Sequence, residues 1–177
     1  MTQLSKLDGK WLATAAEWLA AEENYRWLDF GGDVQILTPM MLQVMARRDI
    51  HCLRLFAPAG STRPIGIVGL SNITAFFKTA TLWYVLGDKT YAASGYTTRA
   101  ALQLLDHGFR CLGLQAIGAW AVDGNVASIR VLEKTGFRPV GRQRRCHRLG
   151  DRYVDRLLFD LLAHEHPRTR CIQTSSH

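Results

Sequence analysis

Long apolar runs are missing from this chain of 177 residues, and none approaches the roughly 20 apolar residues that a membrane-spanning helix needs. Residues 1–10 also lack the charged and apolar regions of a signal peptide. These absences predict a cytoplasmic protein with no membrane partner. No internal repeat divides the chain. We therefore expect one domain over residues 1–163, followed by a polar tail over 164–177 that we expect to be disordered.

Cysteine is scarce, with four residues at positions 52, 111, 146 and 171. Their spacing matches neither a zinc site nor a redox pair, and a reducing compartment disfavours disulfides. We therefore expect no bound metal. We interpret the cysteines as small buried side chains, Cys171 excepted.

Acidic residues are outnumbered, and the net charge is +7. Residues 138–156 alone hold seven arginines and two aspartates. A basic segment of this kind can bind nucleic acid, but zinc-finger, helix-turn-helix and aromatic RNA-binding signatures are lacking. We expect no nucleic-acid partner and favour a solvated hairpin face. A small anionic ligand or an acidic partner protein remains open.

Periodicity places the secondary structure. Helical spacing begins near Trp11, and Thr38-Pro39 is a second helix start, with a side-chain cap and proline at the first helical position. Further helices are expected over 97–110 and from Asn125 to about Lys134 or Thr135. The aromatic stretch 24–35 is expected to be a loop. Strands are expected over 50–57, 65–70, 79–86 and 114–122, followed by a long hairpin of 138–148 and 152–162.

The helix that starts at Asn125 has both ends specified in the sequence. Asn125 is a favoured N-cap, and Gly136 suits the left-handed position after the last turn. Phe137 then follows where it can pack on Leu132.

A second local signal lies over residues 83–99. An apolar strand end, Trp83 to Leu86, is followed by the small residues Ala92 to Gly95, and helical spacing begins at Tyr96. Such a turn aims backbone N–H groups and a positive helix end at one point, which suits a phosphate. Many turns of this shape bind nothing, so the signal alone leaves both possibilities open.

Three stretches give the chain a family resemblance. They are Gly66-Ile-Val-Gly-Leu-Ser-Asn-Ile73, residues 87–100, and Asn125-Val-Ala-Ser-Ile-Arg-Val-Leu-Glu-Lys-Thr-Gly-Phe137, followed by Gly141 and the hairpin 150–155. Together they resemble the GNAT acetyltransferase superfamily, in its RimJ/RimL-type branch. The resemblance implies an α/β (α+β) GNAT fold: a mixed, mostly antiparallel sheet with a splayed parallel strand pair, about four flanking helices, and a first strand that is short or missing.

The resemblance also implies an acyl-CoA donor, acetyl-CoA or another acyl-CoA, bound where strands 79–86 and 114–122 splay apart. Backbone groups of Val85 and Leu86 would pair with the pantetheine arm. The implied pyrophosphate loop and its surroundings comprise Ala92, Ala93, Ser94, Gly95, Tyr96, Thr97, Asn125 and Arg130. For Arg130 and Lys134, contact with CoA phosphates and simple solvation are both open.

For catalysis, the resemblance implies Ser128 as the proton donor to the departing thiolate, with Asn125 beside it. Many relatives use a tyrosine on the same helix, but that position is Leu132 here. The alternative for Ser128 is a hydroxyl bonded to its own helix backbone.

Two departures from the family pattern bear on function. Ala92 replaces a long polar residue of the phosphate loop, and Ala93 restricts a positive φ where glycine would not. The glutamate that often serves as general base is replaced by Leu82. The remaining candidates for a base acting through water are Glu23, Asp29, Tyr84 and His51. For His51 and for His147, an ordinary core or surface histidine is the simpler interpretation.

A site without a strong base suits an amine of low pKa. At pH 7 an amine with a pKa of ~10.4 is neutral in roughly one molecule in 2,500, against roughly one in seven for a pKa of ~7.8. We therefore expect the primary amine of a small metabolite, such as an amino acid or amino sugar, bound beside Trp27, Phe30 and Tyr84. A ribosomal-protein N-terminus as acceptor, an acidic carrier protein as donor, and a non-catalytic binding module are the alternatives. The chain is expected to be a monomer or a homodimer.

Overall fold

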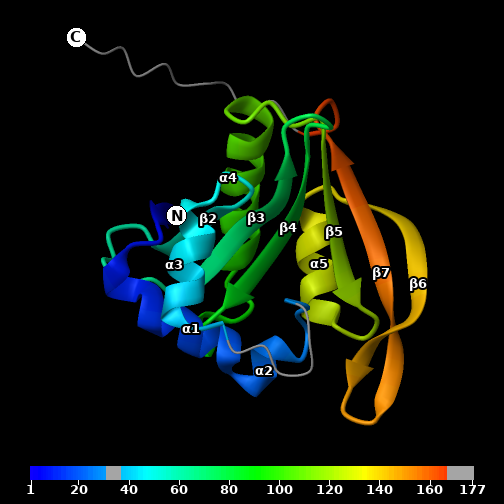
Figure 1. Ribbon diagram of the computed structural model, residues 1–177, viewed down its shortest axis with the longest axis horizontal. Coiled ribbons are helices and arrows are strands. Elements are labelled where there is room, and N and C mark those ends of the chain that lie inside the picture. Colours follow the sequence, from blue (N-terminus) through cyan, green and yellow to red (C-terminus); the bar gives the residue numbers. More distant parts are fainter. Residues whose placement is uncertain (31–36, 167–177) are drawn as a thin grey trace.

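The computed structural model describes residues 1–30 and 37–166. Its centre is a seven-stranded sheet in the order β1-β2-β3-β4-β5-β7-β6 (Figure 1). The strands are Thr2–Lys6 (β1), Cys52–Pro58 (β2), Gly66–Thr74 (β3), Thr79–Leu86 (β4), Ala116–Val122 (β5), Arg138–Leu149 (β6) and Arg152–Leu162 (β7). The first strand, expected to be short or missing, is present and short, and it pairs with β2.

Five α-helices accompany the sheet in the described part of the chain. They are Leu12–Ala20 (α1), Glu22–Tyr25 (α2), Pro39–Arg47 (α3), Tyr96–Arg110 (α4) and Val126–Lys134 (α5). The single turn α2 begins before the stretch that we expected to be a loop and runs into it. The buried Asn24 explains the turn, because its side-chain amide donates to the Trp18 carbonyl oxygen at 2.8 Å and ties α2 to α1. Residues 31–36 of the expected loop lie outside the described residues.

The parallel pair β4–β5 sits between antiparallel neighbours. Its three register pairs are Thr79–Ala116, Ala80–Ile117 and Thr81–Gly118. Beyond Thr81 the two strands are not paired, whereas β3 stays paired with β4 as far as Leu86. The splayed parallel pair is therefore confirmed, and it opens towards the carboxyl ends of both strands.

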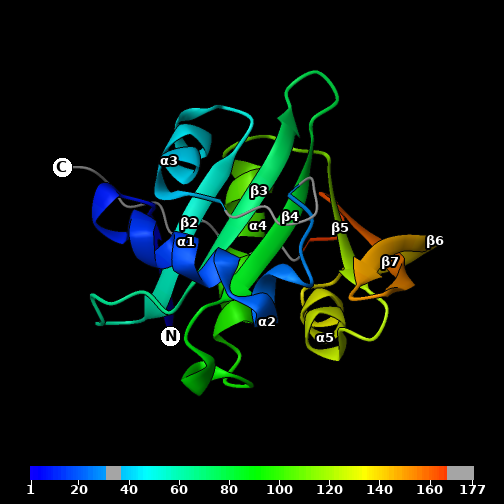
Figure 2. The same ribbon diagram turned by 60° about the horizontal axis from the view of Figure 1, so that its bottom comes forward.

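Each face of the sheet carries its own apolar core. Tyr84 and Leu86 pack with the cluster under α4 and α5, whereas Trp83 and Val85 pack with the cluster under α1 and α3. This alternation is that of a strand with both faces covered. Figure 2 shows the two helical layers on either side of the strands. The unpaired ends of β4 and β5 therefore lie between two separately covered faces.

Helix α5 follows its local sequence closely. The Asn125 side chain accepts from the Ser128 amide at 3.2 Å, and Gly136 has a φ of 91°. The N–H of Phe137 bonds to the Leu132 carbonyl at 3.0 Å, and the N–H of Gly136 bonds to that of Glu133 at 3.1 Å. These two bonds form a Schellman motif, so both predicted helix ends are confirmed.

Several expected boundaries shift by one to four residues. Helix α3 ends at Arg47 and β2 begins only at Cys52, so Ile50 lies in the turn between them and is exposed. The prediction that Cys111 is buried is wrong, because it follows the last residue of α4 and faces solvent. Cys52 is buried and Cys146 is half-buried, while Cys171 lies outside the described residues.

After β7 the chain continues in a turn through residues 163–166. The ring of His166 is buried there against Phe109, with 5.2 Å between the ring centroids. Residues 167–177 lie outside the described residues, and the single domain over 1–163 stays a prediction. Within the described parts of the chain, no helix has the length and apolar character to cross a membrane.

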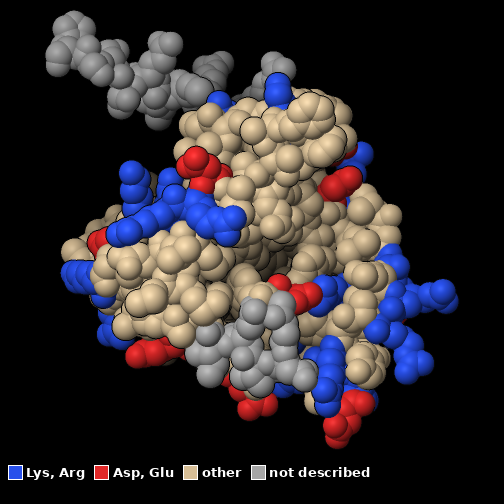
Figure 3. All heavy atoms as spheres, viewed as in Figure 1, with Lys and Arg blue, Asp and Glu red and all other residues tan. Residues whose placement is uncertain are grey.

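The basic hairpin β6–β7 forms one edge of the sheet. Lysine and arginine side chains gather along this edge in Figure 3. Arg138 pairs with Glu165, and Arg142 lies between Asp123 and Asp155. Nearly all of β6 is exposed. The exposure of β6 agrees with the solvated hairpin face expected from the sequence.

Candidate functional site

A cavity of about 920 Å³ opens where β4 and β5 part. The molecular surface is hollowed near the middle of the face shown in Figure 3. The cavity is lined by the carboxyl half of β4, the start of α4, the inner side of α5, and α2 and α3. All the predicted cofactor residues except Ser94 line it: Val85, Leu86, Ala92, Ala93, Gly95, Tyr96, Thr97, Asn125 and Arg130. The cavity therefore includes the region proposed to bind the acyl donor. The three residues proposed to bind the acceptor amine, Trp27, Phe30 and Tyr84, also line it.

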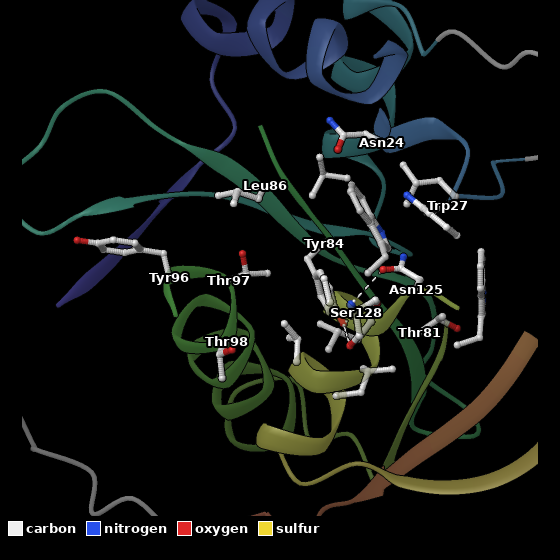
Figure 4. A pocket seen from close by; sticks show the side chains of 18 of the residues that line it. Asn24, Trp27, Thr81, Tyr84, Leu86, Tyr96, Thr97, Thr98, Asn125 and Ser128 are labelled. Carbon is white, nitrogen blue, oxygen red and sulfur yellow. Dashed lines mark hydrogen bonds between the residues drawn. The ribbon is translucent and has the colours of Figure 1, made fainter. Parts of the chain in front are cut away.

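One end of the cavity is formed by the start of α4. Gly95 precedes the helix with a φ of 74° and offers no side-chain cap. Among the described residues, nothing accepts a hydrogen bond from the N–H groups of Tyr96, Thr97 and Thr98. Figure 4 shows these three residues together at the start of the helix. Free N–H groups at a helix N-terminus favour an anion such as a pyrophosphate.

The loop before α4 adopts the conformation that its alanine disfavours. Ala93 has a φ of 59°, a left-handed conformation in which a Cβ is strained. The loop is held by Arg99, a residue that sequence reasoning missed. Its guanidinium donates to the Ser94 carbonyl at 2.9 Å and to the Thr2 hydroxyl at 3.0 Å, and it stacks on the Tyr96 ring.

Replacing Ala93 with glycine is expected to stabilise the protein by about 1 kcal/mol and to raise Tm by about 2–4 °C. The reason is that glycine reaches the left-handed conformation without strain, which outweighs its greater freedom in the unfolded chain. Thermal unfolding measures the change. Ala92→Gly is the matched control, because Ala92 is also exposed but has a φ of −58°. It should lower Tm, and an equal rise in both variants would contradict the prediction.

The opposite wall carries a pair of hydroxyl groups. Tyr84 of β4 donates to the Ser128 carbonyl at 3.0 Å, and its oxygen lies 3.0 Å from the Ser128 hydroxyl. Figure 4 shows both side chains pointing into the cavity beside Asn125. The Ser128 hydroxyl therefore meets a phenol from the sheet rather than bonding to its own helix backbone. Burial raises the pKa of Tyr84 well above its ordinary value, so the phenol is neutral at physiological pH.

The acceptor end lies on the other face of the sheet. Phe30 packs edge-on against Trp83, with 5.2 Å between the ring centroids, and Trp27 and Met45 complete an apolar wall. Trp27 and Phe30 both line this end of the cavity, whereas Tyr84 lies across the gap with Ser128. Trp18 does not line the cavity, because its indole covers Gly87.

The described carboxylates that line the cavity are both paired. Asp29 accepts from Arg156 at 2.6 Å, and Glu23 lies 3.9 Å from Lys89. Arg156 also stacks on Trp120 and bonds to the ring of His147. The His147 Nε2 bonds to the Arg26 carbonyl at 2.7 Å, so this buried histidine of β6 links the residue that follows α2 to the hairpin β6–β7. No cluster of three metal-binding side chains occurs within residues 1–30 and 37–166.

Comparison with known proteins gives the chain a family. The profile for "Acetyltransferase (GNAT) domain" matches residues 7–138. The probable N-acetyltransferase YjcK of Bacillus subtilis is 33% identical over 105 residues, which are 59% of this chain and 58% of that protein. The chain thus spans only a little over half of this relative.

Two solved structures share the fold. The spermidine N-acetyltransferase of Vibrio cholerae, crystallised with CoA and spermine, has a TM-score of 0.81 at 17% identity, over 93% of this chain and 96% of that one. The ribosomal-protein-S5-alanine acetyltransferase of Vibrio fischeri has a TM-score of 0.77 at 22% identity, over 94% and 95%. The RimJ/RimL-type branch stays a prediction, since neighbours of both kinds occur. The match over residues 7–138, together with the splayed sheet, shows that the chain belongs to the GNAT acetyltransferase family.

Proposed function

We propose that this protein transfers an acetyl or other short acyl group from acyl-CoA to a low-pKa primary amine of a small metabolite, by direct transfer. The observation that carries this proposal is the Tyr84–Ser128 hydroxyl pair at the gap between β4 and β5. Direct transfer needs a proton for the thiolate that leaves the thioester. A serine hydroxyl held by a neutral phenol at this gap can supply that proton, which makes Ser128 the proposed donor and Tyr84 its positioning residue.

The other end of the cavity supports an acyl-CoA donor. The unpartnered N–H groups at the start of α4 and the exposed Arg130 and Lys134 offer donors and positive charge to the diphosphate and phosphate groups of CoA. Val85 and Leu86, which also line the cavity, are the proposed backbone partners of the pantetheine arm.

The charges at the acceptor end favour an amine of low pKa over a polycation. A polyamine needs free carboxylates for its several ammonium groups, and Glu23 and Asp29 already face Lys89 and Arg156. Making an amine with a pKa of ~10.4 neutral at pH 7 costs about 4.6 kcal/mol, against about 1.1 kcal/mol for a pKa of ~7.8. An amino acid or amino sugar therefore needs less help from the protein than a lysine side chain.

A protein N-terminus is the second candidate acceptor, and α3 favours it. Met41 lines the cavity, while Met40 and Val44 on the same short helix are 74% and 55% exposed. A peptide that extends out of the cavity would cover these apolar side chains, but a small metabolite would not. An acetyltransferase for ribosomal-protein N-terminal alanine would use such a surface. Transfer to an alanine-leading peptide at a higher kcat/KM than to any free amino acid would select it.

The proposal is tested first by thermal unfolding with and without acetyl-CoA at about 1 mM. A ligand present at 100 times its Kd adds about 2.7 kcal/mol, which for a chain of this size raises Tm by roughly 5–11 °C. A panel of amines that spans low and high pKa follows, with the release of CoA as the readout. A lysine side chain or polyamine as the best acceptor would contradict the low-pKa proposal.

The remaining alternatives are separated by the same assay. Turnover of an acyl-carrier thioester, with none of acetyl-CoA, would select the acidic carrier protein as donor. Binding of acetyl-CoA without transfer to any amine would select the non-catalytic module.

A further inference from the structure

Three side chains from three separate segments form a hydrogen-bonded group at the acceptor end of the cavity. His51 precedes β2, Ser71 lies in β3, and Trp83 lies in β4; all three line the cavity. The Trp83 indole donates to the Ser71 hydroxyl oxygen at 2.8 Å, and the His51 Nδ1 lies 2.9 Å from the same oxygen. We refer to these residues as the His51 group.

The surrounding packing fixes this group in place. A Cβ on Gly69 would lie 2.5 Å from the Trp83 ring, so the indole occupies the space that this glycine leaves free. The Phe30 ring also packs against the indole in a T-shaped arrangement. The His51 amide donates to the Arg48 carbonyl at 3.0 Å, which closes the turn before β2. The imidazole is therefore oriented by its bond to Ser71 and by the turn that carries it, while Gly69 and Phe30 hold the indole that shares Ser71.

The two imidazole nitrogens of His51 differ in their hydrogen bonding within the described part of the chain. Nδ1 faces Ser71, and within the described residues Nε2 has no hydrogen-bond partner. When Nδ1–H donates to Ser71, the lone pair of the neutral ring is on Nε2. Ser71 can accept from both Trp83 and His51 because a hydroxyl oxygen has two lone pairs.

The position of the group matches the chemistry of direct transfer. Ser71 pairs across the sheet with Thr81, the last residue of β4 that pairs with β5. The His51 group lies on the face of α1 and α3, while Tyr84 and Ser128 lie on the face of α4 and α5. A reaction at the gap thus has the imidazole of His51 on its amine side, where the described carboxylates Glu23 and Asp29 are already paired, and a hydroxyl donor on its sulfur side.

The charges around His51 favour its neutral form. Burial and the nearby Arg48 both lower its pKa below the ordinary value. The groups that face it from β3 and β4, Ser71 and Trp83, are uncharged. His51 is therefore a free base at pH 7 and becomes protonated only as the pH falls through its lowered pKa.

We propose that His51 is the general base of the transfer, with Ser71 and Trp83 as its positioning residues; this inference rests on the proposed function. His51 Nε2 takes one proton from the substrate ammonium and passes it to solvent. The free amine attacks the thioester carbonyl, the C–N bond forms, and the C–S bond breaks. The nitrogen then loses its second proton to solvent, the thiolate takes a proton from Ser128, and Ser128 takes one back from solvent. The products are the amide, CoA thiol and one released proton.

This assignment accounts for the missing carboxylate. The position at which relatives often carry glutamate is Leu82, which is 3% exposed and packs in the core under α4 and α5. The base has instead been placed on the opposite face, two strands away from β4. A histidine is sufficient there because an acceptor with a pKa of ~7.8 needs only a weak base.

The test is His51→Gln, which keeps a polar side chain of similar length. The kcat/KM for the amine is measured from pH 5.5 to 9, together with the KM for acetyl-CoA and the thermal shift caused by acetyl-CoA. We expect about a tenfold loss at pH 7, an acidic limb that moves from the lowered pKa of His51 up to the pKa of the amine itself, and unchanged acetyl-CoA binding. A variant with the wild-type rate and pH profile would overturn the inference while leaving the proposed function intact.

Two further variants keep the test decisive if His51→Gln folds poorly. Arg48→Gln removes a neighbouring positive charge, raises the pKa of His51 and should move the acidic limb to higher pH; an unmoved limb counts against the inference. His107→Gln is the matched control, since His107 is also half-buried with a lowered pKa but does not line the cavity. It should leave the profile unchanged. Wild-type protein that binds acetyl-CoA but acetylates no amine would refute the proposed function itself, and the inference with it.

Discussion

Replacing Ser128 with alanine is expected to lower kcat by about 100-fold while the KM for acetyl-CoA stays within about twofold. The hydroxyl that meets Tyr84 at 3.0 Å is lost, and with it the proposed proton donor to the thiolate. An effect on kcat alone is expected because the group acts only as the C–S bond breaks. Steady-state release of CoA thiol measures both constants.

The partner residue provides the control for this prediction. Tyr84→Phe keeps the ring in the core under α4 and α5 but removes the phenol that holds Ser128, and about a tenfold loss of kcat is expected. Because the two residues act as one unit, the double variant should be no slower than Ser128→Ala alone. Losses that multiply, or a fall in Tm of more than about 4 °C in Ser128→Ala, would point to a structural role instead.

The parts of the fold that were predictable are those specified by neighbouring residues. Helix α5 was placed from Asn125 at one end and from Gly136 and Phe137 at the other, and each end makes the predicted hydrogen bonds. The splayed pair β4–β5 came from the resemblance, since spacing alone does not show where two parallel strands part. Helix α2 was missed because the contact that holds it, from Asn24 to Trp18, depends on how α1 and α2 meet.

The same limit applied to the candidate site: residues in a local motif could be predicted, whereas contacts between distant segments could not. Ser128 stood in a motif and could be named, but its partner Tyr84 lies 44 residues earlier in the chain. His51 looked like an ordinary core or surface histidine because its partners are 20 residues and more away and on different strands. Ala93 was expected to resist a positive φ, and only the packing of Arg99 against Ser94 and Tyr96 shows how the loop holds it.

Replacing Gly66 with alanine is expected to destabilise the protein by about 3 kcal/mol and to lower Tm by about 6–12 °C. Gly66 lies in β3 between Phe56 of β2 and Leu86 of β4. A Cβ there would overlap the Phe56 ring and lie 2.5 Å from the Val85 carbonyl oxygen. Differential scanning calorimetry measures the loss. Gly9→Ala is the control, because a Cβ at Gly9 would meet open space.

A second substitution should restore only part of the stability lost in Gly66→Ala. This partial recovery separates the contact with the Phe56 ring from the contact with the Val85 carbonyl oxygen. Phe56→Leu in the Gly66→Ala protein shortens the side chain that the new methyl group meets, so part of the lost stability should return. The contact with the Val85 carbonyl remains, because it involves the backbone of β4. That strand is also the proposed partner of the pantetheine arm, so the double variant should still show a smaller thermal shift with acetyl-CoA than the wild type. If β4 is fixed, neither the stability nor the thermal shift with acetyl-CoA should recover completely. Full recovery of both would mean that the Phe56 ring alone requires glycine at this position and that β4 can move freely.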